Sequence, residues 1–297
     1  MSFLRAKSAL NRTRFADLRT VPQTGSTNAD MKLLLSAAGS AEMRQGTTQV
    51  SPIVLLADHQ TAGRGRLNRS WQAPPGSSLL MTIGLPLTAI AADRRSLLTN
   101  CLALAVIDAL HQLDINQVGI KWPNDLVCEP DPVSESTADS KQALSADGNT
   151  QGYYKLGGIL AEIHQIPRLG DCALLGLGLN VNWPEVPTEL LGIASSLNKI
   201  AGHEISREDL VIYLLRSLDA QWLPILEEPD SSLAVIFETY RARSASLGRR
   251  VHVTLPQGEL VGLATNLSPE GALLLLDDAG TEHVVTVGDV VHLRPTS

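Results

Sequence analysis

Lys-Trp-Pro-Asn-Asp, residues 121–125, ends a short apolar run that begins at residue 118. Pro123 restricts the residue before it to extended geometry, and Asn124 and Asp125 favour a turn. That turn would present an ammonium, an amide and a carboxylate near one another, and a carboxylate there can hold Mg²⁺ on a nucleotide phosphate. The turn preferences alone fit an ordinary strand end with a packed indole equally well.

An arginine- and glycine-rich loop lies upstream of this turn. Residues 60–71 are Gln-Thr-Ala-Gly-Arg-Gly-Arg-Leu-Asn-Arg-Ser-Trp, and they follow an apolar run at residues 53–57. Glycine lets the backbone approach a ligand closely, and the planar fork of arginine holds phosphate or carboxylate. The loop is therefore suited to close over an anionic ligand, although its composition also fits a solvated basic loop. It is neither a Walker loop nor a Rossmann fingerprint, because Asn68 stands where the third glycine of the latter belongs.

Two predicted strands downstream carry paired glycines. Residues 155–162 are Lys-Leu-Gly-Gly-Ile-Leu-Ala-Glu, and residues 176–182 are Gly-Leu-Gly-Leu-Asn-Val-Asn. Glycine inside a strand weakens it and often marks a close backbone approach, such as a ligand lying across the sheet. A β-bulge explains the first segment equally well, and a plain core strand is the simpler interpretation of the second.

Small polar residues precede the first long predicted helix. Residues 25–30 are Gly-Ser-Thr-Asn-Ala-Asp, in which Thr27 and Asp30 form a capping box. Capping does not prevent the hydroxyls and the amide of this segment from contacting a polar ligand. Both roles therefore remain open.

The remaining pattern predicts an α+β fold in which helices flank a mixed sheet. The predicted strands cover residues 15–21, 53–57, 78–85, 118–121, 156–163 and 173–181. The predicted helices cover residues 27–43, 95–113, 207–226 and 231–245.

Two boundaries organise the chain. Residues 129–152 are rich in Ser, Asp, Gln, Pro and Gly, and we expect a flexible insertion there because they bury too little apolar surface. Beyond residue 246 the pattern changes to short strands with tight turns, which favours a small β-barrel. We therefore predict a main domain at residues 1–246 and a second domain at residues 247–297.

Composition excludes several classes of protein. The net charge of −7 argues against a protein that coats nucleic acid. The three cysteines have neither zinc-like nor redox spacing. The first residues lack a secretory h-region, and no apolar run is long enough for a membrane span. The expected location is the cytoplasm, without a membrane partner.

Taken in their order along the chain, these motifs resemble the biotin–protein ligase family. The matching segments are Ser-Thr-Asn, Gln-x-Ala-Gly-Arg-Gly-Arg, Lys-Trp-Pro-Asn-Asp, Lys-Leu-x-Gly-Ile-Leu and Gly-x-Gly-x-Asn, and the resemblance extends from about residue 15 to the end. It implies a catalytic domain like those of class II synthetases and biotin–lipoate ligases, followed by a small SH3-like barrel. It also implies ATP and Mg²⁺ as cofactors.

The resemblance assigns roles to individual residues. Those implied to bind biotin are Ser26, Thr27, Asn28, Gln60, Gly63, Arg64, Gly65, Arg66, Lys155 and Gly158. Those implied to bind ATP are Arg66, Arg69, Trp71, Lys121, Asn124 and Asn180. The implied catalytic residues are Lys155, Arg66 and Asp125, with Asp125 also the candidate Mg²⁺ ligand.

The implied reaction has two steps. Biotin is adenylated with ATP to biotinyl-5′-AMP and is then transferred to a lysine of a biotin carboxyl carrier protein or domain of an acyl-CoA carboxylase. The rival hypotheses are a lipoate– or octanoate–protein ligase of related fold, a non-catalytic biotin-sensing module and a DNA-binding repressor. Only about 14 residues precede the first matched strand, too few for the winged-helix domain of bifunctional relatives, so we expect no DNA binding. A homodimer remains open.

Two positions depart from the family pattern. Gly157 stands where the family often has alanine, which we expect to be a small change. The segment at residues 129–152 replaces what is a tight hairpin in many relatives.

Overall fold

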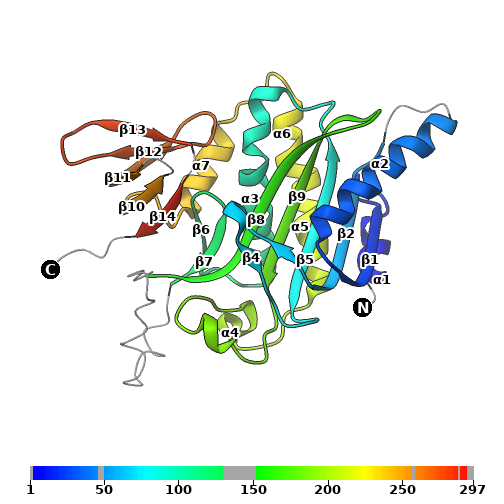
Figure 1. The fold of residues 1–297 in the computed structure, drawn as a ribbon, viewed down its shortest axis with the longest axis horizontal. Coiled ribbons are helices and arrows are strands. Elements are labelled where there is room, and N and C mark those ends of the chain that lie inside the picture. Colours follow the sequence, from blue (N-terminus) through cyan, green and yellow to red (C-terminus); the bar gives the residue numbers. More distant parts are fainter. Residues whose placement is uncertain (1–2, 46–49, 130–151, 256–257, 287, 293–297) are drawn as a thin grey trace.

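The computed structural model describes residues 3–45, 50–129, 152–255, 258–286 and 288–292 (Figure 1). The insertion predicted at residues 129–152 lies, apart from its two ends, outside the described residues.

A seven-stranded mixed sheet forms the body of the molecule, in the order β1-β2-β5-β9-β8-β7-β6. Only the pair β1–β2 is parallel, and every other neighbouring pair is antiparallel. The strands are β1 (Asp17–Thr24), β2 (Ile53–Gln60), β5 (Ser78–Pro86), β6 (Val118–Lys121), β7 (Asp125–Cys128), β8 (Tyr154–Ile166) and β9 (Gly170–Asn180). The predicted mixed sheet with flanking helices is thus confirmed.

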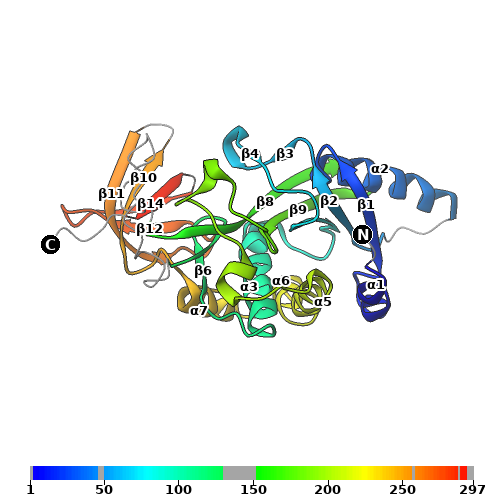
Figure 2. The same cartoon turned by 90° about the horizontal axis from the view of Figure 1, so that it is seen from below.

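Helices cover the two faces of this sheet unequally (Figure 2). The helices are α1 (Leu4–Leu10), α2 (Thr27–Gln45), α3 (Leu98–His111), α4 (Leu197–Ala201), α5 (Arg207–Ser217), α6 (Leu223–Glu227) and α7 (Ala234–Arg243). Figure 2 shows α3, α5, α6 and α7 on one side of the sheet and the short hairpin of β3 (Gly63–Arg64) and β4 (Ser70–Trp71) on the other.

The alternation of side chains along the strands accounts for two cores. Val54 and Leu56 of β2 belong to the main core together with α3 and α5, whereas Ile53 and Leu55 pack with Met31 of α2 on the opposite face. Successive residues of a strand point to opposite faces, so a strand buried on both faces is apolar throughout. Because α2 covers only part of its face, the sheet is left accessible beside it.

The helix predicted over residues 207–226 contains an irregular turn. The run passes from α5 through a π-helical segment, Leu218–Trp222, into α6. Trp222 is fully buried there, and its indole nitrogen donates to Asp108 of α3 at 2.8 Å. This contact anchors the irregular turn to α3.

A five-stranded antiparallel sheet follows at the C-terminal end, in the order β13-β12-β11-β10-β14. Its strands are β10 (Arg250–Leu255), β11 (Gly258–Leu267), β12 (Leu273–Leu276), β13 (Glu282–Val285) and β14 (Asp289–His292). It lies beside the β6–β7 end of the main sheet (Figure 1). The buried Trp122 joins the two sheets, because its indole nitrogen donates to the carbonyl of Gly271 at 3.0 Å.

Candidate functional site

A cavity of about 120 Å³ opens on the sheet face that α3 does not cover. Strands β8 and β9 form its floor, the start of α2 forms one wall, and the β3–β4 hairpin lies over it. The residues that line it are Ser26, Thr27, Asn28, Gln60, Arg64, Gly65, Arg66, Arg69, Ser70, Trp71, Met81, Asn124, Asp125, Lys155, Gly158, Ile159, Leu160, Gly176, Leu177 and Gly178.

Glycines keep the floor of the cavity free of side chains. A Cβ at Gly176 would lie 2.4 Å from Oδ1 of Asn28, and one at Gly178 would lie 2.5 Å from the indole of Trp71. No side chain can occupy those positions unless its neighbour moves. The segment at residues 176–182, for which a plain core strand was the simpler interpretation, therefore has glycines that admit a close approach by side chains of the protein itself.

The glycines of β8 have two explanations that hold together. The β7–β8 pairing shifts register between Leu126 and Val127, so a bulge is present. Gly158 faces the cavity, where its Cβ would lie 3.4 Å from Oδ1 of Asp125. A Cβ at Gly157 would lie 2.8 Å from the carbonyl oxygen of Gly178, so alanine there would require the adjacent strand to move.

Opposite charges meet at one end of the cavity. Antiparallel pairing of β6 with β7 brings Lys121 opposite Asp125 across the turn at residues 122–124. The ammonium of Lys155 lies 2.6 Å from Oδ1 of Asp125, and their side chains are 35% and 22% exposed. The ammonium also lies 5.9 Å from the centre of the Trp71 ring. Both charges of the pair are thus accessible to a ligand.

Arg66 reaches the same end from the loop above. Its Nη1 donates to Oδ1 of Asn124 at 3.3 Å, and Nδ2 of Asn124 donates to the carbonyl of Ile159 at 2.7 Å. The turn at residues 122–124 is therefore tied both to the loop and to the floor of the cavity.

The loop over the cavity is closed by its own backbone. The amide of Gly65 donates to the carbonyl of Arg69 at 2.7 Å, and the amide of Arg69 donates to the carbonyl of Arg66 at 3.1 Å. A Cβ at Gly63 would lie 2.4 Å from the carbonyl oxygen of Trp71, so glycine is required for the hairpin to close. The sequence spacing thus places several arginines above the floor.

A neutral polar cluster lies at the opposite end of the cavity. Oε1 of Gln60 accepts from the amide of Thr27 at 2.7 Å and lies 3.0 Å from its hydroxyl. The hydroxyl of Thr82 lies 2.8 Å from that of Thr27 and 2.6 Å from Oδ1 of Asn28. Nδ2 of Asn28 donates to Glu162 at 2.8 Å. Hydroxyls and amides of this kind suit an uncharged ligand group that both donates and accepts hydrogen bonds.

All the predicted site residues line this cavity except Gly63, Lys121 and Asn180. Gly63 supports the hairpin, as described above. Lys121 is 6% exposed in β6. Nδ2 of Asn180 donates to the carbonyl of Ser195 at 2.9 Å, while its buried Oδ1 has no hydrogen-bond partner among the described residues. These three lie around the cavity and not on its surface.

The sequence patterns gave no role to Thr82 or Glu162. Thr82 is fully buried in β5, and a threonine in that otherwise apolar stretch was a signal for a polar contact. Glu162 ends the strand segment at residues 155–162, in which the pattern indicates a role only for the lysine and the glycines.

The turn at residues 122–124 also lies close to a buried phenol. Burial raises the pKa of Tyr240, and the charge of Asp125 raises it further. Tyr240 of α7 is 1% exposed, and its hydroxyl has no hydrogen-bond partner in the part of the chain that the structure describes. This phenol therefore stays protonated beside the charged pair.

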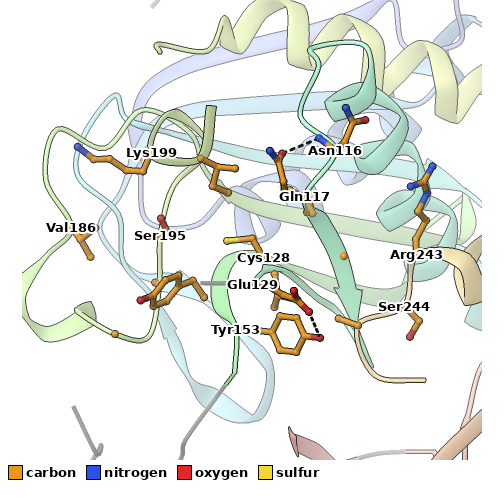
Figure 3. Close-up of a pocket in the computed structure, with 18 of the residues that line it drawn as sticks. Asn116, Gln117, Cys128, Glu129, Tyr153, Val186, Ser195, Lys199, Arg243 and Ser244 are labelled. Carbon is orange, nitrogen blue, oxygen red and sulfur yellow. Dashed lines mark hydrogen bonds between the residues drawn. The ribbon is translucent and has the colours of Figure 1, made fainter. Parts of the chain in front are cut away.

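A second cavity of about 970 Å³ lies at the edge formed by β6 and β7 (Figure 3). Tyr153 stands in it next to Glu129, with the phenol donating at 3.4 Å, and the guanidinium of Arg249 lies 5.0 Å from the Tyr153 ring. Burial raises the pKa of Tyr153. Of the predicted site residues in the described chain, none lines this cavity.

The described residues contain no group of three or more His, Cys, Asp or Glu that could hold a metal ion. Likewise, no helix in the described ranges has the length and apolar character that crossing a membrane requires.

Comparison with known proteins shows what this architecture resembles. The model of the Biotin/lipoate A/B protein ligase family matches residues 38–180, and that of the Biotin protein ligase C terminal domain matches residues 246–293. The biotin–[acetyl-CoA-carboxylase] ligase of Mycobacterium tuberculosis is 36% identical over 284 residues, which are 93% of this chain and 89% of that protein. The chain belongs to the biotin protein ligase family.

More distant members of the biotin protein ligase family are also similar to this chain over most of its length. The Bifunctional ligase/repressor BirA of Escherichia coli is 26% identical over 94% of this chain and 75% of its own length. The solved biotin protein ligase from Aquifex aeolicus in complex with biotin and ATP superposes with a TM-score of 0.69 at 24% identity, covering 94% of this chain and 100% of that one. The fold is therefore that of a biotin protein ligase.

Proposed function

We propose that this chain adenylates biotin with ATP and transfers the biotinyl group to a lysine of the biotin carboxyl carrier of an acyl-CoA carboxylase. One observation carries the proposal. A single cavity has a cationic end, where Lys155 and Arg66 gather around Asp125, and a neutral polar end around Thr27. Biotin has the same division, with a carboxylate at one end and a cyclic urea at the other.

The cationic end suits the first step. The carboxylate of biotin attacks the α-phosphorus of ATP, and pyrophosphate leaves. Both reactants are anions, so fixed cations must screen their repulsion and stabilise the charge that develops. Lys155 lines the cavity from the floor, and Arg66 and Arg69 line it from the loop above. We assign the biotin carboxylate and the α-phosphate to Lys155 and the remaining phosphates to the arginines.

Asp125 has the position for a Mg²⁺ ligand. Magnesium in nucleotide sites is bound through one or two carboxylates together with phosphate oxygens and water, so a single carboxylate beside the phosphates fits its needs. The Lys155 ammonium already neutralises Asp125 at 2.6 Å, and a metal would have to share that carboxylate. When bound, Mg²⁺ would neutralise phosphate charge.

The neutral end suits the cyclic urea of biotin. Thr27 donates its amide to Oε1 of Gln60, which leaves the NH₂ group of Gln60 free to donate toward the cavity. The hydroxyls of Ser26 and Thr27 lie on the same wall. We assign the ureido group to these residues and the aliphatic chain of biotin to the floor at Gly158.

The second step needs a neutral amine. The carrier lysine attacks the carbonyl of biotinyl-5′-AMP, and AMP leaves. A carboxylate within reach of the incoming ammonium can accept its proton, and Asp125 is partly exposed at the same end of the cavity. The hairpin over the cavity would exclude water and slow hydrolysis of the mixed anhydride.

The first experiment is ATP–pyrophosphate exchange with biotin as the only acid. We expect exchange in the unaltered protein and a loss of about 100-fold in Lys155→Ala, because the fixed charge at the reacting anions is gone. Exchange with lipoate but not with biotin would move the substrate to the related ligases. Absence of exchange with either acid, together with measurable biotin binding, would contradict catalysis.

A further inference from the structure

A row of four side chains runs along the neutral end of the cavity. Asn28 contacts Thr82, Thr82 contacts Thr27, and Thr27 contacts Gln60, with oxygen–oxygen distances of 2.6, 2.8 and 3.0 Å. Asn28, Thr27 and Gln60 line the cavity, whereas Thr82 lies beneath them and is fully buried.

Both ends of this row are acceptors. Oε1 of Gln60 must face Thr27, because the backbone amide of Thr27 can only donate and does so at 2.7 Å. The amide of Asn28 is oriented by Glu162, since a carboxylate accepts hydrogen bonds and takes one from Nδ2 at 2.8 Å. The carbonyl of Leu160, also an acceptor, lies 3.5 Å from the same nitrogen. Oδ1 of Asn28 therefore faces Thr82.

The row has fewer protons than contacts. Three oxygen–oxygen contacts join the four side chains, but only the hydroxyls of Thr82 and Thr27 can supply a proton to them. One contact must therefore bring two oxygens together without a hydrogen. The single proton of Thr82 can go to Asn28 or to Thr27 but not to both, so one of these two oxygens lacks a hydrogen until a donor comes from outside.

We infer that Glu162 is a positioning residue which keeps this row one proton short, and that the row thereby selects ligands that bring an N–H donor. An N–H group donated by the ligand to Oδ1 of Asn28 frees the Thr82 proton for Thr27 and the Thr27 proton for Gln60. Each of the three acceptor oxygens then receives a hydrogen, and only the Asn28–Thr82 contact is left without one. This inference rests on the proposed function, in which the ligand is biotin with its two ureido N–H groups.

Glu162 acts through Asn28 and does not line the cavity. A glutamine at this position keeps the shape but can offer its NH₂ group to Asn28. The Asn28 amide can then turn, donate to Thr82 and complete the row without a ligand. Glu162→Gln should therefore weaken biotin binding, although Glu162 does not contact biotin and the two side chains have nearly the same volume.

The experiment compares biotin with its cyclic carbamate analogues, in which one or the other ureido N–H is replaced by oxygen. We expect Glu162→Gln to raise the KM for biotin about tenfold in pyrophosphate exchange and to change kcat little. A tenfold rise in KM corresponds to the loss of about one hydrogen bond. Calorimetric titration with biotin alone should give the same ratio. The carbamate that lacks the N–H facing Asn28 should bind the unaltered protein about tenfold more weakly than biotin does. The same carbamate should bind Glu162→Gln nearly as well as biotin does.

Two comparisons separate this role from a structural one. His164 lies on the same strand with Nε2 3.9 Å from the other oxygen of Glu162, so His164→Gln should leave the KM unchanged. Thr82→Ser keeps the hydroxyl and should behave as the unaltered protein, whereas Thr82→Val should raise the KM for biotin. Thermal unfolding identifies any variant that fails to fold.

The outcomes are distinct for the two ideas. If the unaltered protein performs no biotin-dependent exchange, the proposed function fails. If exchange occurs but Glu162→Gln leaves the KM for biotin unchanged, the role of Glu162 is overturned. It is also overturned if each carbamate loses the same affinity relative to biotin in the unaltered protein and in Glu162→Gln. An equal effect of Thr82→Ser and Thr82→Val would also contradict the inference.

Discussion

At the scale of the residue, Asp125 connects the two proposed steps. It lies 2.6 Å from Lys155 and begins β7 directly after the turn at residues 122–124. The same carboxylate is a candidate for Mg²⁺ and for the proton of the carrier lysine. These roles belong to different half-reactions, so kinetics can separate them.

For Asp125→Asn we expect transfer to a carrier domain to fall about 100-fold, a contribution within the range of a general base. Formation of biotinyl-5′-AMP should fall much less, because the amide oxygen of Asn can still ligate Mg²⁺. Rapid-quench measurement of each half-reaction tests this. Asp171→Asn is the matched control, because Asp171 also pairs with a cation, Arg95 at 2.6 Å, but does not line the cavity. Equal losses in both half-reactions would argue for the metal role and against a role specific to transfer.

The space around residue 178 permits only glycine. A Cβ there would meet the Trp71 ring at 2.5 Å, so Gly178→Ala should displace the indole that we assign to the nucleotide. We expect the KM for ATP to rise about tenfold or more, with a smaller change for biotin. Gly25→Ala places the same methyl group in open space near the site and should have little effect. Equal KM values in the two variants would contradict this arrangement.

At the scale of the element, several strands with an apolar run were predictable, including the four-residue β6, whereas the two-residue β3 and β4 were not. The patterns at residues 53–57 and 78–85 correspond to β2 and β5, whose apolar residues are buried on both faces. Strands β3 and β4 have two residues each and exist because the loop between them is hydrogen-bonded across its base. Strands of two residues cannot be predicted from the sequence pattern, because an alternation of apolar and polar residues is recognisable only over several residues.

The start of α5 offers a test of local stability. Ser206 caps this helix, with its hydroxyl accepting from the amide of Asp209 at 3.2 Å. Ser206→Ala should cost about 1 kcal/mol of unfolding free energy and lower the Tm by roughly 2–4 °C. Ser40→Ala is the control, because Ser40 is exposed inside α2, bonds to the preceding turn at 3.0 Å and is replaced by a better helix former. A Tm unchanged in Ser206→Ala would show that the cap contributes nothing.

At the scale of the whole molecule, the order of the motifs along the chain indicated that they form one site, whereas the residue types of each motif alone left its role open. Segments near residues 26, 64, 124 and 155 meet there because β8 and β9 lie at the centre of the sheet. The contact of Thr82 with Thr27 depends on the register of three strands, which no local pattern encodes. The polar row beneath the cavity was therefore beyond what the sequence could predict.

Trp122 joins the two sheets and should influence how they unfold. Trp122→Phe keeps most of the buried surface but leaves the carbonyl of Gly271 without its donor, at a cost of about 1–3 kcal/mol. We expect the C-terminal sheet to unfold earlier and the calorimetric transition to broaden or split. Trp222→Phe, which loses a hydrogen bond to Asp108 within the body, should lower the midpoint without splitting it. Identical traces for the two variants would contradict a linking role for Trp122.

The glycine floor has a consequence for redesign of the cavity. At Gly158, Gly176 and Gly178 the floor carries no side chain of its own, and Asn28 and Trp71 already lie against Gly176 and Gly178. Mutation of the floor can only make the cavity shallower and narrow the range of acids accepted. A variant that takes a bulkier acid must gain its room from the walls and the hairpin, where side chains remain to be shortened. Directed evolution toward larger biotin analogues should therefore collect its changes in residues 64–71 and leave these three glycines untouched.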